Sequence, residues 1–254
     1  MNDQLRICSL SLATLWKDKE ANFKEIKNAF AAEEADIFVL PEMFSTGFCM
    51  EAEEIADRDR ETLNWMKEFS ADKNAAVAGS AAVAEGDRYV NRFYFVKPDG
   101  AYEYYDKRHL FSYSGEDQIY SPGNERKIVE YKGWRILLQV CYDLRFPVFA
   151  RSKKDYDLAL YVANWPEKRA DAWLHLLKAR AIENQAYVVG VNRTGTDGNN
   201  LQYSKSSRAF FADGRNISNP ENDIDRILLD KKVLLDFREH FKFLDDADDF
   251  KLNF

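Results

Sequence analysis

Apolar and polar positions divide this chain into short strands separated by a few amphipathic helices. Residues 5–13 (LRICSLSLA) alternate apolar and polar side chains, which is typical of a strand. An amphipathic helix is predicted next, over 17–35, from the helical spacing of Phe23, Ile26 and Phe30. Residues 36–42 then form a short, apolar strand. Strand, helix and strand in close order predict a β-α-β unit with parallel strands.

The same β-α-β pattern recurs later in the chain, and hairpins lie between the two units. Residues 157–164 and 186–192 are apolar strands on either side of an amphipathic helix over 171–185. A further helix is predicted over 58–74 and leads into a strand at 75–84. Hairpins are predicted at the turns 85–89, 98–100 and 132–133, and over 206–218. The acidic tail, 244–254, is expected to be irregular.

These patterns give about eleven strands and four or more helices. Hairpin and crossover connections are mixed along the whole length, with no Pro/Gly/Ser-rich linker and no internal repeat. The simplest arrangement is therefore a single α/β domain over residues 1–254. In this arrangement two mixed sheets pack on each other and helices cover them.

Composition and charge narrow the classes of function. Hydrophobic residues make up 46% of the chain and charged residues 31%, as in an ordinary globular protein. The net charge of −7 argues against a general affinity for nucleic acid or for an anionic membrane. No apolar run is long enough to cross a bilayer, and the first residues do not resemble a signal peptide. The odd number of cysteines (Cys8, Cys49 and Cys141) favours a reducing cytoplasm over a disulfide framework.

Several common enzyme signatures are absent from the sequence. It contains no G-x-S-x-G elbow, P-loop, G-x-G-x-x-G, H-E-x-x-H or C-x-x-C motif. The histidines, His109, His175 and His240, lack the spacing of metal ligands, so neither a metal nor another cofactor is expected. The histidine count alone leaves a Cys–His protease open, but no local motif favours one.

Reactive side chains instead follow three of the predicted strands. The strands end at Glu42, Lys107 and Cys141 respectively. Ligands of α/β sheets collect beyond the carboxyl ends of strands, so a carboxylate, an ammonium and a thiol converging there would form an acyl-transfer site. Each residue alone also has a structural interpretation: Glu42 as a helix cap, Lys107 as a surface charge and Cys141 as part of the core.

The neighbourhoods of these three residues favour the catalytic interpretation. The segments LPEMFSTGF (40–48), YDKRHLF (105–111) and CYDLRFP (141–147) resemble the three catalytic motifs of the nitrilase superfamily of carbon–nitrogen hydrolases. The resemblance extends from the first strand to the acidic tail and is greatest for the ω-amidase branch, which acts on α-keto acid amides. It implies a four-layer α-β-β-α sandwich of two mixed sheets flanked by helices.

The resemblance also implies a role for each residue. Cys141 would be the nucleophile, Glu42 the general base, and Lys107 the cation that stabilises the oxyanion. The backbone N–H of Tyr142 would be the second oxyanion donor. The substrate would be a short amide such as 2-oxoglutaramate or 2-oxosuccinamate, hydrolysed through a thioester. Cys8 and Cys49 would be inert thiols.

A second glutamate is expected in the loop after the lysine. Glu116 occupies the family's position ahead of the SPG turn, and it would orient Lys107. Its neighbour Asp117 is the less favoured candidate. The structural alternative is that both belong to a solvated acidic loop.

The ANWP segment (163–166) follows a strand end, so Asn164 and Trp165 are expected to line the substrate pocket. Core packing is the alternative for Trp165. A substrate carboxylate would need a cation, for which the candidates are Arg108, Arg145, Lys168 and Arg169. Lys168 and Arg169 are favoured, whereas Arg145 is expected to form an internal salt bridge.

One departure from the family is visible near the later strands. Family members commonly carry Y-x-G-x-S, whereas this chain reads YSKSS, with Lys205 in place of glycine. Lysine there implies an altered loop or a shifted register, and it bears on substrate choice. Other amidases, N-carbamoylases and nitrilases of the superfamily are the alternatives, and a non-catalytic homologue is less favoured. A homodimer is expected by analogy with the family.

Overall fold

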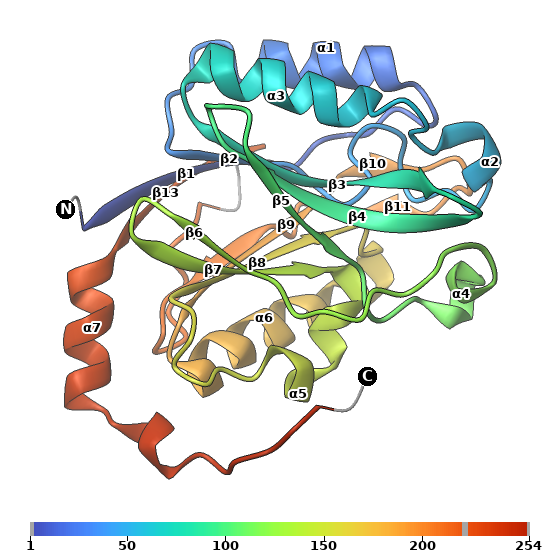
Figure 1. Cartoon of the computed structure of the whole chain (residues 1–254). Helices are drawn as coiled ribbons and strands as arrows, with labels where there is room; N and C mark the ends of the chain where they lie inside the picture. The colour runs from blue at the N-terminus through green and yellow to red at the C-terminus, as the bar shows by residue number, and fades with distance from the viewer. Residues whose placement is uncertain (1–2, 220–222, 253–254) are drawn as a thin grey trace.

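Two β-sheets stacked face to face form the middle of the molecule, and helices cover both outer faces (Figure 1). The structure is a computed structural model, and it describes residues 3–219 and 223–252. The α-β-β-α order of the layers confirms the four-layer sandwich expected from the sequence.

The first sheet has six strands in the order β13-β1-β2-β3-β4-β5. Their bounds are β1 (Gln4–Leu10), β2 (Ile37–Val39), β3 (Ala76–Glu85), β4 (Arg88–Val96), β5 (Tyr102–Asp106) and β13 (Ile224–Asp230). β1, β2 and β3 pair in parallel, and the other pairs are antiparallel. Helix α1 (Lys19–Ala29) connects β1 to β2, which confirms the first predicted β-α-β unit.

The second sheet has five strands in the order β12-β9-β8-β7-β6. Their bounds are β6 (Ile128–Tyr131), β7 (Trp134–Val140), β8 (Leu158–Ala163), β9 (Tyr187–Asn192) and β12 (Arg208–Phe210). Helix α6 (Ala170–Asn184) connects the parallel strands β8 and β9, as predicted. The turn between β6 and β7 is the predicted two-residue one: Lys132 and Gly133 both have positive φ, 48° and 81°, which suits a tight hairpin.

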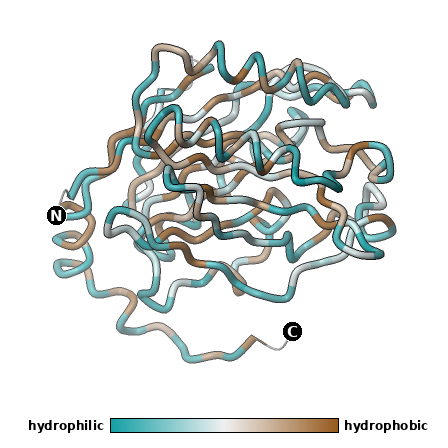
Figure 2. The backbone as a smooth tube through the Cα atoms, turned by 45° about the horizontal axis from the view of Figure 1, so that its top comes forward, coloured by the Kyte–Doolittle hydropathy of each residue, from teal (hydrophilic) through white to brown (hydrophobic). Residues whose placement is uncertain are grey.

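Apolar side chains fill the space between the sheets and under the helices. Figure 2 shows the hydrophobic segments concentrated in the central strands, while the outer helices alternate between polar and apolar positions. Helices α1 and α3 (Glu61–Lys73) lie side by side over the first sheet (Figure 1). Helix α6 packs closely on the second sheet because Gly190 has no side chain: a Cβ there would lie 2.4 Å from Leu177 Cδ1.

Short elements make up the rest of the described chain. They are α2 (Ala52–Ile55), α4 (Glu116–Ile119), α5 (Pro147–Ala150), α7 (Lys231–His240), the short strands β10 (Gly195–Thr196) and β11 (Gln202–Tyr203), and the 3₁₀ turns η1 (Ser112–Ser114), η2 (Cys141–Arg145), η3 (Glu167–Arg169) and η4 (Phe243–Asp246). The sequence analysis missed β13 and α7. The sequence signal for β13 was weak: its residues alternate in burial, but Asp225 is buried and Leu228 is exposed, so polar and apolar residues do not alternate. Of the tail predicted to be irregular, residues 244–246 lie in η4, residues 247–252 are irregular as predicted, and residues 253–254 lie outside the described residues.

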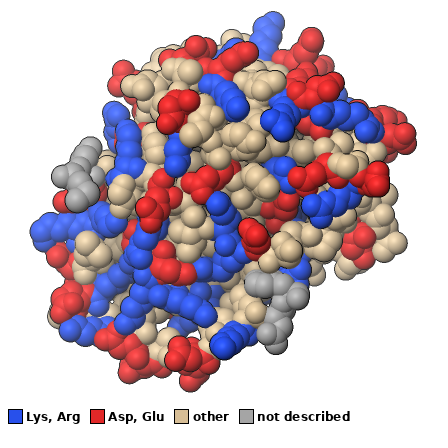
Figure 3. Space-filling view, viewed as in Figure 1, with Lys and Arg blue, Asp and Glu red and all other residues tan. Residues whose placement is uncertain are grey.

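Basic and acidic side chains are mixed over the face shown in Figure 3, and basic ones gather near α7 and the β6–β7 hairpin. The buried carboxylate of Asp157 lies beneath them. Its oxygens form ion pairs with the side-chain nitrogens of Arg135 at 2.8 Å and of Lys231 and Arg238, each at 3.1 Å. Burial alone would raise the pKa of Asp157, but these hydrogen bonds lower it to about 2. Asp157 therefore fastens α7 to the second sheet.

Within residues 3–219 and 223–252, no helix is long and apolar enough to cross a bilayer.

Candidate active site

The loops that follow β2, β5, β7 and β8 meet at one edge of the stacked sheets. They bring together the four residues that the sequence analysis singled out, Glu42, Lys107, Glu116 and Cys141. All four are buried; Cys141, the most accessible of them, is 9% exposed. Because reactive groups at strand ends face the space between loops, this edge is the candidate active site.

Lys107 lies between two carboxylates. Its Nζ is 2.9 Å from Glu42 Oε1, and it lies 2.9 and 2.8 Å from the two carboxylate oxygens of Glu116. Burial alone would lower the pKa of Lys107, but attraction to Glu116 and Glu42 outweighs it and raises the pKa. The side chain is therefore a buried ammonium ion, and the surface-charge interpretation is wrong.

Glu42 is held at both carboxylate oxygens. Besides Lys107, Oε1 accepts a hydrogen bond from Asn91 Nδ2 at 2.8 Å, and Oε2 accepts one from the backbone N–H of Asn164 at 2.8 Å. Glu42 therefore does not cap a helix. Its two oxygens are fixed in place beside Lys107.

Glu116 is the first residue of α4 and is fully buried. In addition to Lys107, it accepts a hydrogen bond from the backbone N–H of Phe111 at 2.6 Å. Burial raises the pKa of Glu116, and Lys107 opposes this effect. The solvated-loop alternative is therefore wrong for Glu116, although it describes the exposed Asp117 well.

Cys141 directly follows β7 and opens the turn η2. Its backbone has φ of 45°, in the left-handed region that few residues other than glycine adopt, and such strain is common at functional sites. Burial and then the negative charge of Glu42 raise the pKa of Cys141, so its resting form is the neutral thiol. The other cysteines lie elsewhere in the core, where burial raises the pKa of Cys8 to about 12.

Sequence reasoning missed a buried aspartate that joins two of the active-site loops. Asp143 accepts hydrogen bonds from the hydroxyl of Tyr105 at 2.9 Å, from the backbone of Val140 at 2.9 Å and from the backbone of His109 at 3.0 Å. The ring of His109 also contacts it, with Nδ1 at 2.8 Å. Asp143 thereby fixes the loop that carries Lys107 against the turn that carries the thiol.

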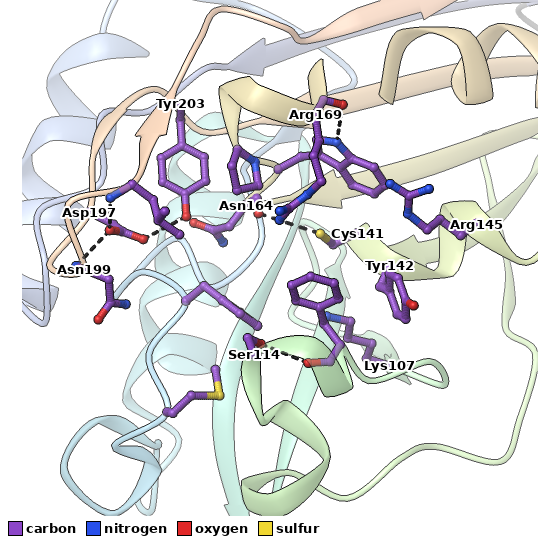
Figure 4. Close-up of a pocket in the computed structure, with 16 residues that line it drawn as sticks. Lys107, Ser114, Cys141, Tyr142, Arg145, Asn164, Arg169, Asp197, Asn199 and Tyr203 are labelled. Atoms are coloured by element: carbon purple, nitrogen blue, oxygen red, sulfur yellow. Dashed lines mark hydrogen bonds between the residues drawn. The ribbon is translucent and has the colours of Figure 1, made fainter. Parts of the chain in front are cut away.

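A cavity of about 300 Å³ opens over Cys141 (Figure 4). The three residues predicted to contact the substrate, Tyr142, Asn164 and Trp165, all line it together with Lys107. Trp165 is also buried, so the core and pocket interpretations both hold for its side chain. The buried Asn164 Oδ1 has no hydrogen-bond partner among the described residues.

Two arginines also line the cavity. The Arg145 guanidinium lies 4.9 Å from the ring of Trp165, and that of Arg169 lies 5.2 Å from the ring of Phe111. Figure 4 shows Arg145 on the side of the cavity opposite Asp197. Neither arginine forms an ion pair with any residue in the described ranges, so the salt bridge expected for Arg145 is not found.

The other candidate cations lie outside this lining. Lys168 is exposed, and Arg108 donates to the backbone oxygen of Gly123 at 3.1 Å. Lys205 is also exposed and pairs with Asp223 at 2.7 Å, while Tyr203 lines the cavity. The backbone of Lys205 lies outside the left-handed region, so a lysine there is not strained.

No metal site accompanies this arrangement in the part of the chain that the structure describes. No three His, Cys, Asp or Glu side chains there are grouped as ligands of a metal ion. The chemistry that the residues offer is instead that of a thiol next to a carboxylate and an ammonium, which suits nucleophilic attack on a carbonyl carbon.

Comparisons with known proteins agree with this geometry. The carbon-nitrogen hydrolase family model matches residues 4–229. Omega-amidase YafV of Yersinia enterocolitica is 46% identical over 253 residues, which cover 98% of each chain. A 2-oxoglutaramate amidase of Bacillus subtilis is 34% identical and covers 85% of this chain and 86% of its own.

Solved structures give the same result. A CN-hydrolase superfamily protein of Xanthomonas campestris, which carries an arsenic adduct in its active site, superimposes with a TM-score of 0.95 at 40% identity, covering 98% of this chain and 99% of its own. Nit3 of Saccharomyces cerevisiae shares the fold, with a TM-score of 0.83 at 20% identity over 94% of each chain. The chain described here belongs to the carbon-nitrogen hydrolase family, also called the nitrilase superfamily.

Proposed function

We propose that this protein is an ω-amidase. It hydrolyses the terminal amide of short α-keto acid amides, such as 2-oxoglutaramate and 2-oxosuccinamate, to the dicarboxylic keto acid and ammonia. The observation that carries this proposal is the Cys141 thiol at a pocket that Lys107 also lines, with Glu42 held beside both. The substrate class is supported by the omega-amidase and 2-oxoglutaramate amidase relatives.

The first half of the reaction forms a thioester. Because the resting Cys141 is a neutral thiol, it needs a base, and Glu42 takes its proton as the sulfur attacks the amide carbon. The charge that develops on the carbonyl oxygen is stabilised by the Lys107 ammonium and by the backbone N–H of Tyr142. Protonated Glu42 then gives its proton to the leaving nitrogen, and ammonia departs.

The second half uses the same groups with water. Glu42, again a carboxylate, takes a proton from a water molecule that attacks the thioester carbon. Collapse of the tetrahedral intermediate releases the acid, and the proton on Glu42 returns to the Cys141 sulfur. Glu116 contacts Lys107 throughout and keeps its ammonium in place.

Recognition of the keto acid end falls to the pocket arginines. Arg145 and Arg169 line the cavity without an ion pair in the described ranges, and stacking on Trp165 and Phe111 restrains both guanidinium groups. An anionic carboxylate at the far end of a short amide complements these two charges. Neutral amides and nitriles offer nothing to them.

The test is release of ammonia from a panel of compounds by the purified protein. The panel holds 2-oxoglutaramate, glutamine, a simple nitrile and an N-carbamoyl amino acid. We expect 2-oxoglutaramate to give the highest kcat/KM. Equal or faster turnover of one of the other three would assign the protein to another amidase, nitrilase or N-carbamoylase activity of the same family.

We further propose that residues 1–254 work as one domain within a cytoplasmic homodimer. A shared core between the two sheets supports the single domain, and three free cysteines suit a reducing compartment. Exposed apolar side chains on α7, such as Val233 and Leu235, support self-association. Sedimentation equilibrium at micromolar concentration tests the dimer.

A further inference from the structure

Asn91 lies at the centre of the active site without lining the substrate pocket. It is in β4, where it pairs with Ala82 of β3, and it is fully buried. An amide side chain inside a strand whose neighbours are mostly apolar needs hydrogen-bond partners, because an unpaired buried amide is destabilising. Its partners are the groups to which the proposed function assigns the chemistry.

The side chain and backbone of Asn91 contact three of these groups. Its Nδ2 donates to Glu42 Oε1 at 2.8 Å and lies 3.4 Å from Glu116 Oε1. Its backbone oxygen accepts the N–H of Lys107 at 2.9 Å. One residue of β4 therefore connects the base, the buried ammonium and the second carboxylate.

A hydrogen-bond relay fixes which end of the amide faces the carboxylates. The backbone N–H of Met43, next to Glu42, donates to Ser80 Oγ at 2.9 Å. Ser80 Oγ in turn donates to Asn91 Oδ1 at 2.8 Å. Because the Ser80 hydroxyl donates its hydrogen to Asn91 Oδ1, the Nδ2 end of the Asn91 amide points toward Glu42. A flipped amide would set its oxygen against two carboxylates.

We propose that Asn91, oriented by Ser80, is a positioning residue that holds the Glu42 carboxylate in place and aimed at the Cys141 thiol. A carboxylate that accepts a hydrogen bond from an amide is favoured in its charged form. The carboxylates of Glu42 and Glu116 share one ammonium, so the Nδ2 donor supplies part of the positive potential that Lys107 alone must otherwise divide between them. This inference rests on the proposed role of Glu42 as the base.

Other ionisable groups also face Glu42, and the test must separate their effects. Lys107 lies at the end of β5, Glu116 in α4 and Cys141 in η2. Tyr120, just after α4, is buried and donates to the backbone oxygen of Cys49 at 2.8 Å. Substitution of Asn91 or Ser80 leaves all of these side chains present, so a change in pH dependence can be assigned to the relay.

The experiment measures alkylation of Cys141 by iodoacetamide as a function of pH, followed by mass spectrometry of the Cys141 peptide. Alkylation forms the S–C bond, expels iodide and passes the thiol proton to Glu42, so it needs no amide substrate. For Asn91→Ala we expect the acidic limb of the rate profile to move up by about one pH unit, so that rates measured on the limb fall by up to about tenfold. Ser80→Ala should move the limb in the same direction by less.

Two further variants make the outcomes distinguishable. Asn184→Ala removes another fully buried asparagine, which is hydrogen-bonded to Arg180 and Ser152 rather than to Glu42 or Glu116, and should leave the limb where it is in the wild type. Glu42→Gln should move the limb to the alkaline range in which the buried thiol itself ionises. A limb that stays at its wild-type position in Glu42→Gln overturns the base assignment of the proposed function. A limb that moves in Glu42→Gln but not in folded Asn91→Ala and Ser80→Ala overturns the positioning role alone.

Discussion

Asn164 donates hydrogen bonds to Glu42 from both its backbone and its side chain. Its backbone N–H donates to Glu42 Oε2 at 2.8 Å, and its Nδ2 donates to the main-chain oxygen of Glu42 at 2.7 Å. Glu42 follows β2 in the first sheet and Asn164 follows β8 in the second, so these bonds join the two sheets beside the thiol. Precise placement of the base thus depends on how the sheets are stacked.

Substitution of Asn164 by alanine should separate the effects of these two hydrogen bonds. Asn164→Ala keeps the backbone donor to the carboxylate but leaves the oxygen of Glu42 without its side-chain donor. We expect the free energy of unfolding to fall by about 1–2 kcal/mol, measured by urea denaturation, with kcat reduced but not abolished. Asn199→Ala, an exposed residue of the same cavity, is the control and should change the free energy of unfolding by less than about 0.5 kcal/mol. Equal losses in the two variants would contradict the link.

Replacement of Cys141 should eliminate catalysis and spare the fold. Cys141→Ala removes only the sulfur, so we expect no measurable ammonia release and a circular dichroism spectrum like that of the wild type. Cys8→Ala and Cys49→Ala should remain active because both thiols lie outside the cavity. Near-wild-type turnover by folded Cys141→Ala would refute the thioester mechanism.

Lys107 is expected to act on rate and on stability together. Lys107→Met should remove oxyanion stabilisation of about 3 kcal/mol, a loss of more than a hundredfold in kcat/KM. It also leaves Glu42 and Glu116 without their shared cation, so the melting temperature should fall. Glu116→Gln should lower the acylation rate more mildly. Lys107→Arg should not restore activity, because a planar guanidinium does not fit the place of a compact ammonium; full activity in that variant would rule out the oxyanion assignment.

The pocket arginines should control affinity for the substrate carboxylate. Arg169→Met is expected to raise KM for 2-oxoglutaramate more than it lowers kcat, the pattern of lost ground-state binding. Arg145→Met should act in the same way. Lys168→Met, an exposed neighbour outside the cavity, is the matched control and should leave both constants unchanged. Steady-state kinetics decides this, and an unchanged KM in both arginine variants would remove them from substrate binding.

The pH dependence of stability should report on Asp157. Its pKa falls from 3.8 to about 2 on folding, so the folded state favours the carboxylate. This contribution is fully present above pH 3.8 and is lost as the pH falls toward 2; its size is about 2 kcal/mol. Asp157→Asn should therefore lower the free energy of unfolding at pH 7 by that order, and the difference from the wild type should shrink at pH 2–3. A constant difference over this range would assign the effect to packing.

Local sequence patterns were enough for the layers and for placing Glu42, Lys107 and Cys141 at strand ends, whereas Glu116 and the catalytic interpretation came from the resemblance to a known family. Parallel β-α-β units and two-residue turns depend on residues that are close in sequence, as the Lys132-Gly133 turn shows. The contacts of Arg145 could not be predicted from local patterns. An arginine close to an acidic residue suggests a salt bridge, whereas the fold stacks Arg145 on Trp165, which is distant in sequence. Asn91 gave a weaker signal, a polar residue within an apolar strand, and its meaning appears only when Glu42 and Ser80 lie beside it.

The left-handed backbone at Cys141 means that stability and activity favour different residues at this position. Glycine is the residue that this conformation favours, and it would relieve backbone strain of about 1 kcal/mol. Glycine carries no sulfur, however. A library of variants selected only for heat resistance would therefore tend to discard the nucleophile, so any programme of thermostabilisation must hold this codon fixed.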